Sequence, residues 1–405
     1  MPVEDCSDMR SNYSWLRGIL ISALLLIGLP NPVTAATRAP HACEADGTQA
    51  SGAIYRICMP DLFWNGDLIL FAHGYVSPTL PVGIPEGQLN LNGTSVPAAV
   101  TSLGYAFAVT SYSANGLAVK EGVADVIDLV SIFKSKHAGV KHVYLMGFSE
   151  GGLVSVLALE QSDVFSGALA ACGQLGSFTV QANHFGDFRT AFDYFFPSLL
   201  PGTPISIPTT LIDNFDTVFT NTIAPQLSNP ANAISLTQLV SVTGIPAPIT
   251  ATAVITQAVR DLLWYNVYGT MDGISKLKGQ PYDNMTRVYS GSLNDTALNA
   301  GVQRFAADAA ALTEMEAFYK PLGRPRVPLV TLHTTGDEIV PYRHEDIFRE
   351  RVVARGMTPR HDNIPVTGYG HCAFSVADIQ SGLTLLQQRV QNPVRFRINL
   401  PVLTK

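Results

Sequence analysis

The fold of this chain is decided by one stretch, Val143-Tyr144-Leu145-Met146-Gly147-Phe148-Ser149-Glu150-Gly151-Gly152-Leu153-Val154. Its first half is an apolar run with the residue types of a buried strand. Its second half continues as Val156-Leu157-Ala158-Leu159, which suits a buried helix. A serine therefore stands at a strand-to-helix turn, in the pattern G-x-S-x-G-G.

The glycines around Ser149 explain how a serine can occupy such a turn. Gly147 and Gly151 lack the Cβ atoms that would collide in a tight strand-to-helix connection. The helix that follows directs its N-terminal N–H groups toward the place where negative charge can develop. We therefore predict that Ser149 is a nucleophile. The simpler alternative is a glycine turn with an exposed serine, since G-x-S-x-G also occurs by chance.

The composition is that of a large globular protein. The chain has 405 residues, of which 47% are hydrophobic, and its net charge is -6. This length and content allow a sizeable core, either as one large domain or as one domain with an insertion. The 26 lysines and arginines form no basic run, which argues against nucleic acid as a partner.

The N-terminus has the pattern of a secretory signal. Arg10 and Arg17 precede an apolar segment over residues 18–29, and the small residues of Val33-Thr34-Ala35-Ala36 follow. This segment is shorter than the ~20 residues that a membrane-spanning helix needs. We predict a signal peptide over residues 1–36, a secreted or periplasmic mature protein, and no stable membrane span after cleavage. An uncleaved N-terminal anchor is the alternative, because acidic residues also precede the apolar segment.

The cysteine count agrees with export. Removal of the signal peptide takes away one of five cysteines and leaves an even number, which an oxidising compartment would pair. Cys43 and Cys58 flank Asp46-Gly47, a hairpin-turn signal, so we predict that they form one disulfide. By elimination Cys172 pairs with Cys372, although four cysteines allow three pairings in principle.

Strands and helices alternate on both sides of the serine turn. Short apolar runs such as residues 67–72 predict strands, and apolar residues at three- and four-residue steps over residues 117–136 predict a helix. This α/β alternation predicts a mostly parallel sheet with helices on both faces. The alternation stops after residue 172 and resumes near residue 326. We therefore predict a core of residues 37–172 and 326–405, interrupted by a large helical cap over residues 173–325.

Two residues near the C-terminus can complete the chemistry of Ser149. A serine hydroxyl is a weak nucleophile, so it needs a base beside it and a carboxylate that orients the base. On this kind of sheet the order along the chain is serine, acid, histidine. Asp337 follows a predicted strand in the pattern D-x-x-V-P, and His371 lies in a glycine-flanked loop after the last predicted strand. Because the carboxyl ends of parallel strands meet at one edge, we predict that the three side chains lie together.

Other acids and histidines compete for these roles. Glu338 and Glu345 are rival acids, and the aspartate could be an ordinary turn residue. Eight other histidines compete with His371. Of these, we expect His333 to be a core residue within its apolar strand, and His344 to lie at the surface.

The negative charge on an attacked carbonyl oxygen needs two backbone donors. One should be the N–H of Glu150, directly after the serine. The other should come from the loop after the strand that ends at His73-Gly74, and we assign it to Tyr75. His73 itself is expected to position the loop. An ordinary strand-ending turn is the alternative for this segment.

Four short pieces of the chain resemble the α/β-hydrolase superfamily of serine hydrolases. They are Phe71-Ala72-His73-Gly74-Tyr75, Gly147-Phe148-Ser149-Glu150-Gly151-Gly152, Gly336-Asp337-Glu338-Ile339-Val340-Pro341 and Gly370-His371. The resemblance implies the α/β-hydrolase fold, a triad of Ser149, Asp337 and His371, and an oxyanion hole from Tyr75 and Glu150. The doubled glycine is similar to that of the prolyl-oligopeptidase family. The cysteine after His371 is similar to that of feruloyl esterases and tannases, although phenylalanine, not cysteine, precedes the serine here.

The predicted cap is rich in aromatic residues, which favour an apolar or aromatic acyl group. We predict substrate contacts from Phe185, Phe188 and Phe192, and the alternative is that these residues form the cap's own core. No close pair of cysteines or histidines has metal-ligand spacing, and no glycine loop for a phosphate or dinucleotide occurs. We therefore predict no metal and no cofactor.

Together these features predict an exported serine hydrolase, and first of all a carboxylic ester hydrolase with a Ser-His-Asp acyl-enzyme mechanism. Its substrate would be a small-molecule ester or peptide. A serine at the turn, rather than a carboxylate, directs the chemistry to esters, thioesters or amides. A serine peptidase or amidase of prolyl-oligopeptidase-like type is the first alternative. A non-catalytic binding protein on the same fold is the second.

Overall fold

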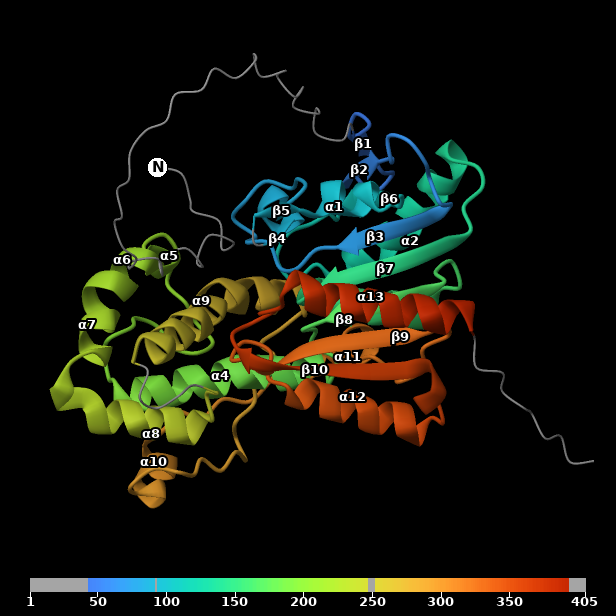
Figure 1. Cartoon of the computed structure of the whole chain (residues 1–405). Coiled ribbons are helices and arrows are strands. Elements are labelled where there is room, and N and C mark those ends of the chain that lie inside the picture. The colour runs from blue at the N-terminus through green and yellow to red at the C-terminus, as the bar shows by residue number, and fades with distance from the viewer. Residues whose placement is uncertain (1–42, 92, 247–251, 393–405) are drawn as a thin grey trace, which may run out of the picture.

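The computed structural model describes residues 43–91, 93–246 and 252–392, so the predicted signal peptide lies outside the described residues. The strands of the main sheet are β1 (Gly47–Thr48), β2 (Ile54–Cys58), β3 (Asp67–Ala72), β6 (Ala106–Thr110), β7 (His142–Phe148), β8 (Gly167–Ala171), β9 (Leu329–Gly336) and β10 (His361–Tyr369). They pair in the order β1-β2-β6-β3-β7-β8-β9-β10 (Figure 1). β2 is antiparallel to β1 and β6, and all other neighbours are parallel. The predicted mostly parallel sheet is thus confirmed.

Both faces of the sheet are covered because successive strand residues point to opposite sides. In β3, Leu68 and Leu70 belong to one apolar cluster, whereas Ile69 and Phe71 belong to another. The first cluster includes residues of α2 (Val119–Lys136), α3 (Glu150–Gln161), α11 (Ala309–Phe318) and α12 (Arg343–Ala354). The second includes residues of α1 (Val96–Ser102) and α13 (Val376–Gln391). The predicted layers of helix, sheet and helix are therefore present.

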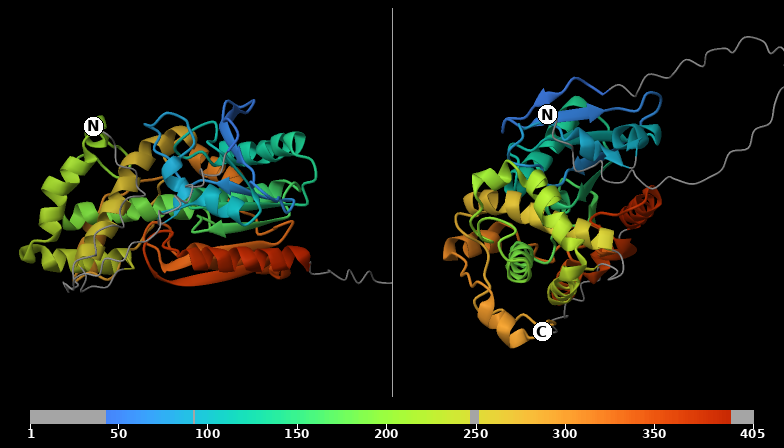
Figure 2. Two further views of the ribbon diagram at one scale, coloured as in Figure 1. Left: turned by 45° about the horizontal axis from the view of Figure 1, so that its top comes forward. Right: turned by 90° about the vertical axis from the view of Figure 1, so that its left-hand side faces the viewer.

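A largely helical segment connects β8 to β9. Its helices are α4 (Phe178–Phe195), α5 (Thr209–Ile212), α6 (Phe215–Val218), α7 (Ala224–Leu227), α8 (Ala233–Thr243), α9 (Thr252–Lys276) and α10 (Asp295–Gly301), and α11 follows them. Helices α4 to α9 share an apolar cluster that is separate from the clusters on the sheet. They lie beyond the carboxyl ends of β3 and β7 (Figures 1 and 2), and we call them the cap. Among the described residues, no helix is both long and apolar enough to cross a membrane.

The N-terminal hairpin differs from its prediction in the position of the turn. Gly47 lies within β1 and pairs with Tyr55, so the predicted turn at Asp46-Gly47 is wrong. The chain reverses a few residues later, where the N–H of Gly52 donates to the carbonyl oxygen of Gln49. Gly52 has φ +91°, a conformation that glycine adopts without strain. The segment therefore has two possible turns, one at Asp46-Gly47 and one at residues 49–52. The chain uses the second, in which Gly47 can pair with β2.

Candidate active site

Ser149 lies at the sharp turn between β7 and α3. Its backbone φ is +56°, in the left-handed region that residues other than glycine rarely adopt. A Cβ atom at Gly147 would collide with the carbonyl group of Gly151, and one at Gly151 would collide with the carbonyl oxygen of Ala72. Only glycine fits at both positions, so the pattern around the serine follows from the close approach of β7, α3 and β3.

The ring of His371 bridges Ser149 and Asp337. Its Nε2 atom lies 2.8 Å from Ser149 Oγ, and its Nδ1 atom lies 2.8 Å from Asp337 Oδ2. Because an ionised carboxylate only accepts hydrogen bonds, Nδ1 carries the proton donated to Asp337. Nε2 is then free to accept from the serine hydroxyl. The structure therefore brings together the three side chains that the sequence singles out, from the serine turn, the loop after β9 and the loop after β10.

Asp337 is a buried carboxylate with several partners. Only 1% of its surface is exposed, and its Oδ1 accepts from the N–H groups of Ile339 at 3.0 Å and Val340 at 2.8 Å. Burial alone would raise the pKa of this carboxyl. The charges and hydrogen bonds of His371 and His333 outweigh burial and hold that pKa well below its usual range. Asp337 therefore stays ionised and can orient the ring of His371.

A second histidine lies behind Asp337, within β9 as predicted. His333 Nε2 is 2.8 Å from the carbonyl oxygen of Val340 and 3.5 Å from Asp337 Oδ2, and its Nδ1 is 3.2 Å from Glu345 Oε1. The other oxygen of Glu345 accepts from a hydroxyl at 2.7 Å and an amide at 3.0 Å. Both ring nitrogens of His333 thus face acceptors. Although burial lowers it, the hydrogen bonds and charges of the two carboxylates raise the pKa of His333 to about 10, so the ring is a buried cation.

The loop after β3 lies against the serine turn. A Cβ atom at Gly74 would lie 3.2 Å from the Cβ atom of Ser149. Gln88 clamps this loop, because its Oε1 accepts from the N–H of Gly74 at 2.7 Å and its Nε2 donates to the carbonyl oxygen of Tyr75 at 3.2 Å. Glu150 is the first residue of α3. Tyr75 directly follows Gly74, which lies against the serine turn, and Glu150 directly follows Ser149. The backbone N–H groups of an oxyanion hole would have to come from these two segments.

Two other buried histidines near the site are neutral. Burial lowers the pKa of His73 to about 4, and its ring stacks on Tyr112 with 3.8 Å between ring centres. The expectation that His344 lies at the surface is wrong, since it is fully buried and its Nδ1 accepts from the N–H of Gly176 at 3.1 Å. Burial lowers the pKa of His344 well below its usual value. The reason for the error is that α12 turns a polar pair, His344 and Glu345, toward the sheet.

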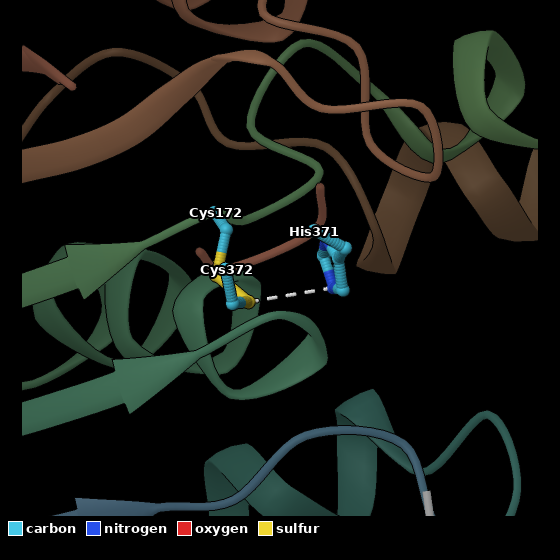
Figure 3. Close-up of side chains that lie close together, drawn as sticks. All are labelled: Cys172, His371 and Cys372. Carbon is cyan, nitrogen blue, oxygen red and sulfur yellow. Dashed lines mark hydrogen bonds between the residues drawn. A yellow bond between two sulfur atoms is a disulfide. The ribbon is translucent and has the colours of Figure 1, made fainter. Parts of the chain in front are cut away.

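A disulfide joins the end of β8 to the histidine loop. The structure contains both predicted pairings, Cys43 with Cys58 and Cys172 with Cys372. The second bridge lies beside the ring of His371 (Figure 3), with Cys372 Sγ 3.4 Å from His371 Nε2. Because Cys172 directly follows β8 and Cys372 directly follows His371, the bridge ties the ring to the sheet.

The same three residues are close enough to be considered as metal ligands. Within the described ranges, Cys172, His371 and Cys372 offer ligand atoms that lie within 4.8 Å of one another. Both sulfur atoms belong to the disulfide, however, and the thiolate is the form of cysteine that binds metals. In the oxidised protein this cluster therefore does not have the donor set of a metal site.

A cavity lies between the cap and the serine end of the sheet. Its walls include Tyr75 and Glu150 on the sheet side and Phe185 and Tyr265 on the cap side. The rings of Phe185 and Tyr265 stack with 5.3 Å between their centres. Phe185, one of the three predicted substrate contacts, therefore lines a cavity.

Phe188 and Phe192, the other two predicted substrate contacts, do not lie at this cavity, and their positions agree with the alternative that they form the cap's own core. Both side chains are buried in the apolar cluster of the cap, and neither lines the cavity. Helix α4 starts on the core and runs outward, so each further residue lies about 1.5 Å deeper in the cap. The cavity instead receives Gln174 and Gln181, which the sequence did not single out. A lone glutamine carries no sequence signal that separates a cavity wall from a solvated helix face.

Comparison with known proteins gives matches among solved structures alone. No family model matches the sequence, and no curated protein matches it. The chain is similar to feruloyl esterase B from Aspergillus oryzae, with a TM-score of 0.51 and 14% identity over 86% of this chain and 80% of that chain. This likeness, at such low identity, shows the fold.

Two further structures match with lower TM-scores. Lipase A from Candida antarctica in its closed state has a TM-score of 0.45 and 14% identity, over 87% of this chain and 78% of that chain. Acylaminoacyl peptidase from Pyrococcus horikoshii has a TM-score of 0.44 and 11% identity, over 89% of this chain. This chain spans 43% of the length of that peptidase.

Proposed function

Because the chain has the α/β-hydrolase fold, we propose that it is a serine hydrolase and that its substrate is a carboxylic ester. One observation carries the proposal: the ring of His371 lies 2.8 Å from Ser149 Oγ and 2.8 Å from Asp337 Oδ2. This contact supplies a nucleophile, a base and an orienting carboxylate in one place. Acyl transfer through a serine ester is the chemistry that these groups perform together.

In the acylation step, Ser149 Oγ attacks the ester carbonyl carbon while its proton passes to His371 Nε2. The resulting imidazolium is stabilised by Asp337, which keeps its negative charge. When the tetrahedral intermediate collapses, the proton moves from Nε2 to the leaving alcohol. Water then repeats the sequence on the acyl-enzyme, which releases the acid and restores the serine.

The oxyanion of each tetrahedral intermediate is proposed to accept hydrogen bonds from the N–H groups of Tyr75 and Glu150. The position of Glu150 at the first turn of α3 supports this role, because such N–H groups have no partner within the helix. Each donor of this kind contributes roughly 2.7–4 kcal/mol to stabilisation of the transition state.

Two substrates separate the ester hydrolase from a peptidase or amidase with the same triad. We expect purified mature protein to hydrolyse 4-nitrophenyl butyrate, and Ser149→Ala to lower kcat by roughly 10⁶-fold. An aminoacyl 4-nitroanilide should be cleaved far more slowly. Faster cleavage of the anilide than of the ester, as measured by kcat/KM, would instead favour the peptidase.

Active-site labelling tests the alternative of a non-catalytic binding protein. A fluorophosphonate should label the wild type and leave Ser149→Ala unlabelled, because the reagent needs an activated serine. Circular dichroism of both proteins controls for folding. A folded wild type that takes up no label would contradict the proposed hydrolase.

We also propose that the mature protein acts outside the cytosol. The two disulfides support this location, since disulfides persist in oxidising compartments. Mass spectrometry of protein recovered from the periplasm or medium should find an N-terminus directly after residue 35 or 36. Full-length protein that stays in the cytosol with reduced cysteines would rule out this part of the proposal.

A further inference from the structure

Three buried polar atoms, in residues that line the cavity under the cap, have no hydrogen-bond partner among the residues that the structure describes. They are Oε1 of Gln174, Oε1 of Gln181 and the hydroxyl oxygen of Tyr75. Gln181 is fully buried, and Gln174 is 8% exposed. A buried acceptor without a donor is unfavourable, so a molecule that brings donors to these atoms would be bound in preference to one that does not.

The amide of Gln181 has only one orientation that suits its surroundings. Its Nε2 donates to the carbonyl oxygen of Ile339 at 2.7 Å, and a carbonyl oxygen can accept but not donate. Oε1 is therefore the amide atom that is left without a partner, in a residue that lines the cavity. Ile339 lies two residues after Asp337, so Gln181 links the wall of the cavity to the acid loop. Tyr75 and Glu150 also line the cavity.

The remaining wall is mostly apolar and nearly uncharged. Phe178, Phe185 and Leu277 line it, and the described lining includes no lysine, arginine or aspartate. Burial raises the pKa of the Glu150 carboxyl to about 8, so this group is largely neutral at pH 7. The cavity therefore has no charge with which to select an ionic ligand.

Two glycines of α9 keep the cavity open. Gly269 and Gly273 are one helical turn apart, and both line the cavity. Apart from its chain neighbours and the backbone of its own helix, a Cβ atom at either position would meet no atom of the described residues within 4 Å. Glycine destabilises a helix interior relative to alanine. Two glycines that stand beside open space on one face of α9 are therefore explained if a ligand occupies that space.

We propose that this cavity binds the group next to the scissile bond of the substrate, and that this group is compact, uncharged, mainly apolar and bears a hydroxyl. The hydroxyl donates to Gln181 Oε1, with Gln174 Oε1 as the second acceptor for a group that bears two. The apolar part lies against Phe185 and the open face of α9. This inference rests on the proposed function for its link to catalysis, because the cavity is lined by Tyr75 and by Glu150, which directly follows Ser149.

Phenol and anisole test the preference for a donor, because the phenol hydroxyl can donate a hydrogen bond, whereas anisole, its methyl ether, has no donor and is larger by one methyl group. Calorimetry on wild-type protein should give a Kd for phenol about tenfold lower than that for anisole. Gln181→Met should bring the two values together without weakening anisole. Gln388→Met, on the exposed surface of α13, is the matched control and should leave both values unchanged. Phenol should also inhibit hydrolysis of 4-nitrophenyl acetate competitively.

Gly269→Leu gives a second test that does not depend on how well Gln181→Met folds. It fills the cavity from a helix that tolerates side chains better than glycine, so binding of both rings should be lost. Binding that is unchanged in Gly269→Leu, or equal affinity for phenol and anisole in the wild type, would overturn the proposal. Donor-dependent binding that leaves ester hydrolysis uninhibited would overturn its link to the substrate. Since calorimetry needs no turnover, absence of any ester hydrolysis would refute the proposed function and leave the ligand site intact.

Discussion

Replacement of His333 by glutamine should remove a pH-dependent part of the free energy of unfolding. In the folded chain this histidine has a pKa of about 10, whereas its ordinary value is 6.5. Between these values the folded state binds one proton more than the unfolded state, so this group makes the free energy of unfolding fall as pH rises. Its stabilising contribution is fully present below pH 6.5 and is lost as pH rises through about 10.

The magnitude follows from the proton count. One extra bound proton gives a slope of about 1.4 kcal/mol per pH unit. From pH 7 to pH 9, the difference in unfolding free energy between wild type and His333→Gln should therefore shrink by about 3 kcal/mol. Titrating groups that do not interact with His333 are common to both proteins and cancel in the difference. The double variant His333→Gln with Glu345→Gln should lose the same pH dependence of the unfolding free energy between pH 7 and pH 9. It also removes Glu345, the carboxylate that the single variant leaves without its cation.

The assay is urea unfolding followed by circular dichroism at half-unit steps between pH 5 and pH 9.5. His344→Gln is the matched control, because burial lowers the pKa of that neighbouring histidine instead of raising it. Below pH 6.5, the His344 side chain binds more protons in the unfolded state than in the folded state. The plot of unfolding free energy against pH for His344→Gln should therefore differ in slope from the wild-type plot below pH 6.5 but not above pH 7. Wild-type and His333→Gln curves that run parallel from pH 7 to pH 9 would refute the buried cation between Asp337 and Glu345.

Two single substitutions and a pair of double cysteine substitutions probe other parts of the structure. Asp337→Asn should lower kcat for 4-nitrophenyl butyrate by roughly 10⁴-fold while circular dichroism stays unchanged, since an amide leaves the imidazole in the wrong tautomer. Glu150→Gln should raise the free energy of unfolding, with no gain below pH 4.5 and the full gain near pH 8, because burial raises the pKa of this acid to about 8; a uniform effect across pH in urea unfolding would contradict this. Replacing Cys172 and Cys372 together by alanine should destabilise the protein by about 5 kcal/mol, against about 3 kcal/mol for the Cys43 and Cys58 pair, because the bridges span 200 and 15 residues; equal losses would show that loop entropy is not the cause.

The parts of the site that the sequence predicts are those whose chemistry has a local signature. Gly147 and Gly151 are visible in the sequence because only glycine fits the contacts of the serine turn. Asp337 and His371 are visible because parallel strands bring their carboxyl ends to one edge, so order along the chain translates into proximity. Strand and helix spans followed from apolar periodicity for the same reason, since period and burial are set by neighbouring residues.

The parts that the sequence did not predict depend on contacts between distant elements. Helix α12 buries His344, Glu345, Phe348 and Val352, so a polar turn and an apolar turn share one face. Apolar periodicity predicts that the first turn of α12, with His344 and Glu345, is exposed to solvent. Its burial follows from pairing with His333 of β9, a contact with no local pattern. The position of Gln181 at the cavity could not be predicted for the same reason. The sequence pattern of an amphipathic helix indicates which residues are polar, but not whether they face solvent or a cavity.

The strained backbone of Ser149 is held in place by the two elements that it joins. A residue with positive φ other than glycine costs roughly 1–3 kcal/mol, which relaxation of the turn would recover. Strand β7 is paired on both sides, with β3 and β8, and residues 150–159 of α3 are all buried. Relaxation would have to move one of these elements through a close-packed core, which is far more costly than the strain. The cap has an apolar cluster that is separate from those on the sheet, and Gln181 reaches the site through its hydrogen bond to the carbonyl oxygen of Ile339 rather than through the serine turn. Gln181→Met should therefore change which substrates are hydrolysed while fluorophosphonate still labels Ser149 at the wild-type rate, and a loss of labelling would show that cap and serine turn are mechanically coupled.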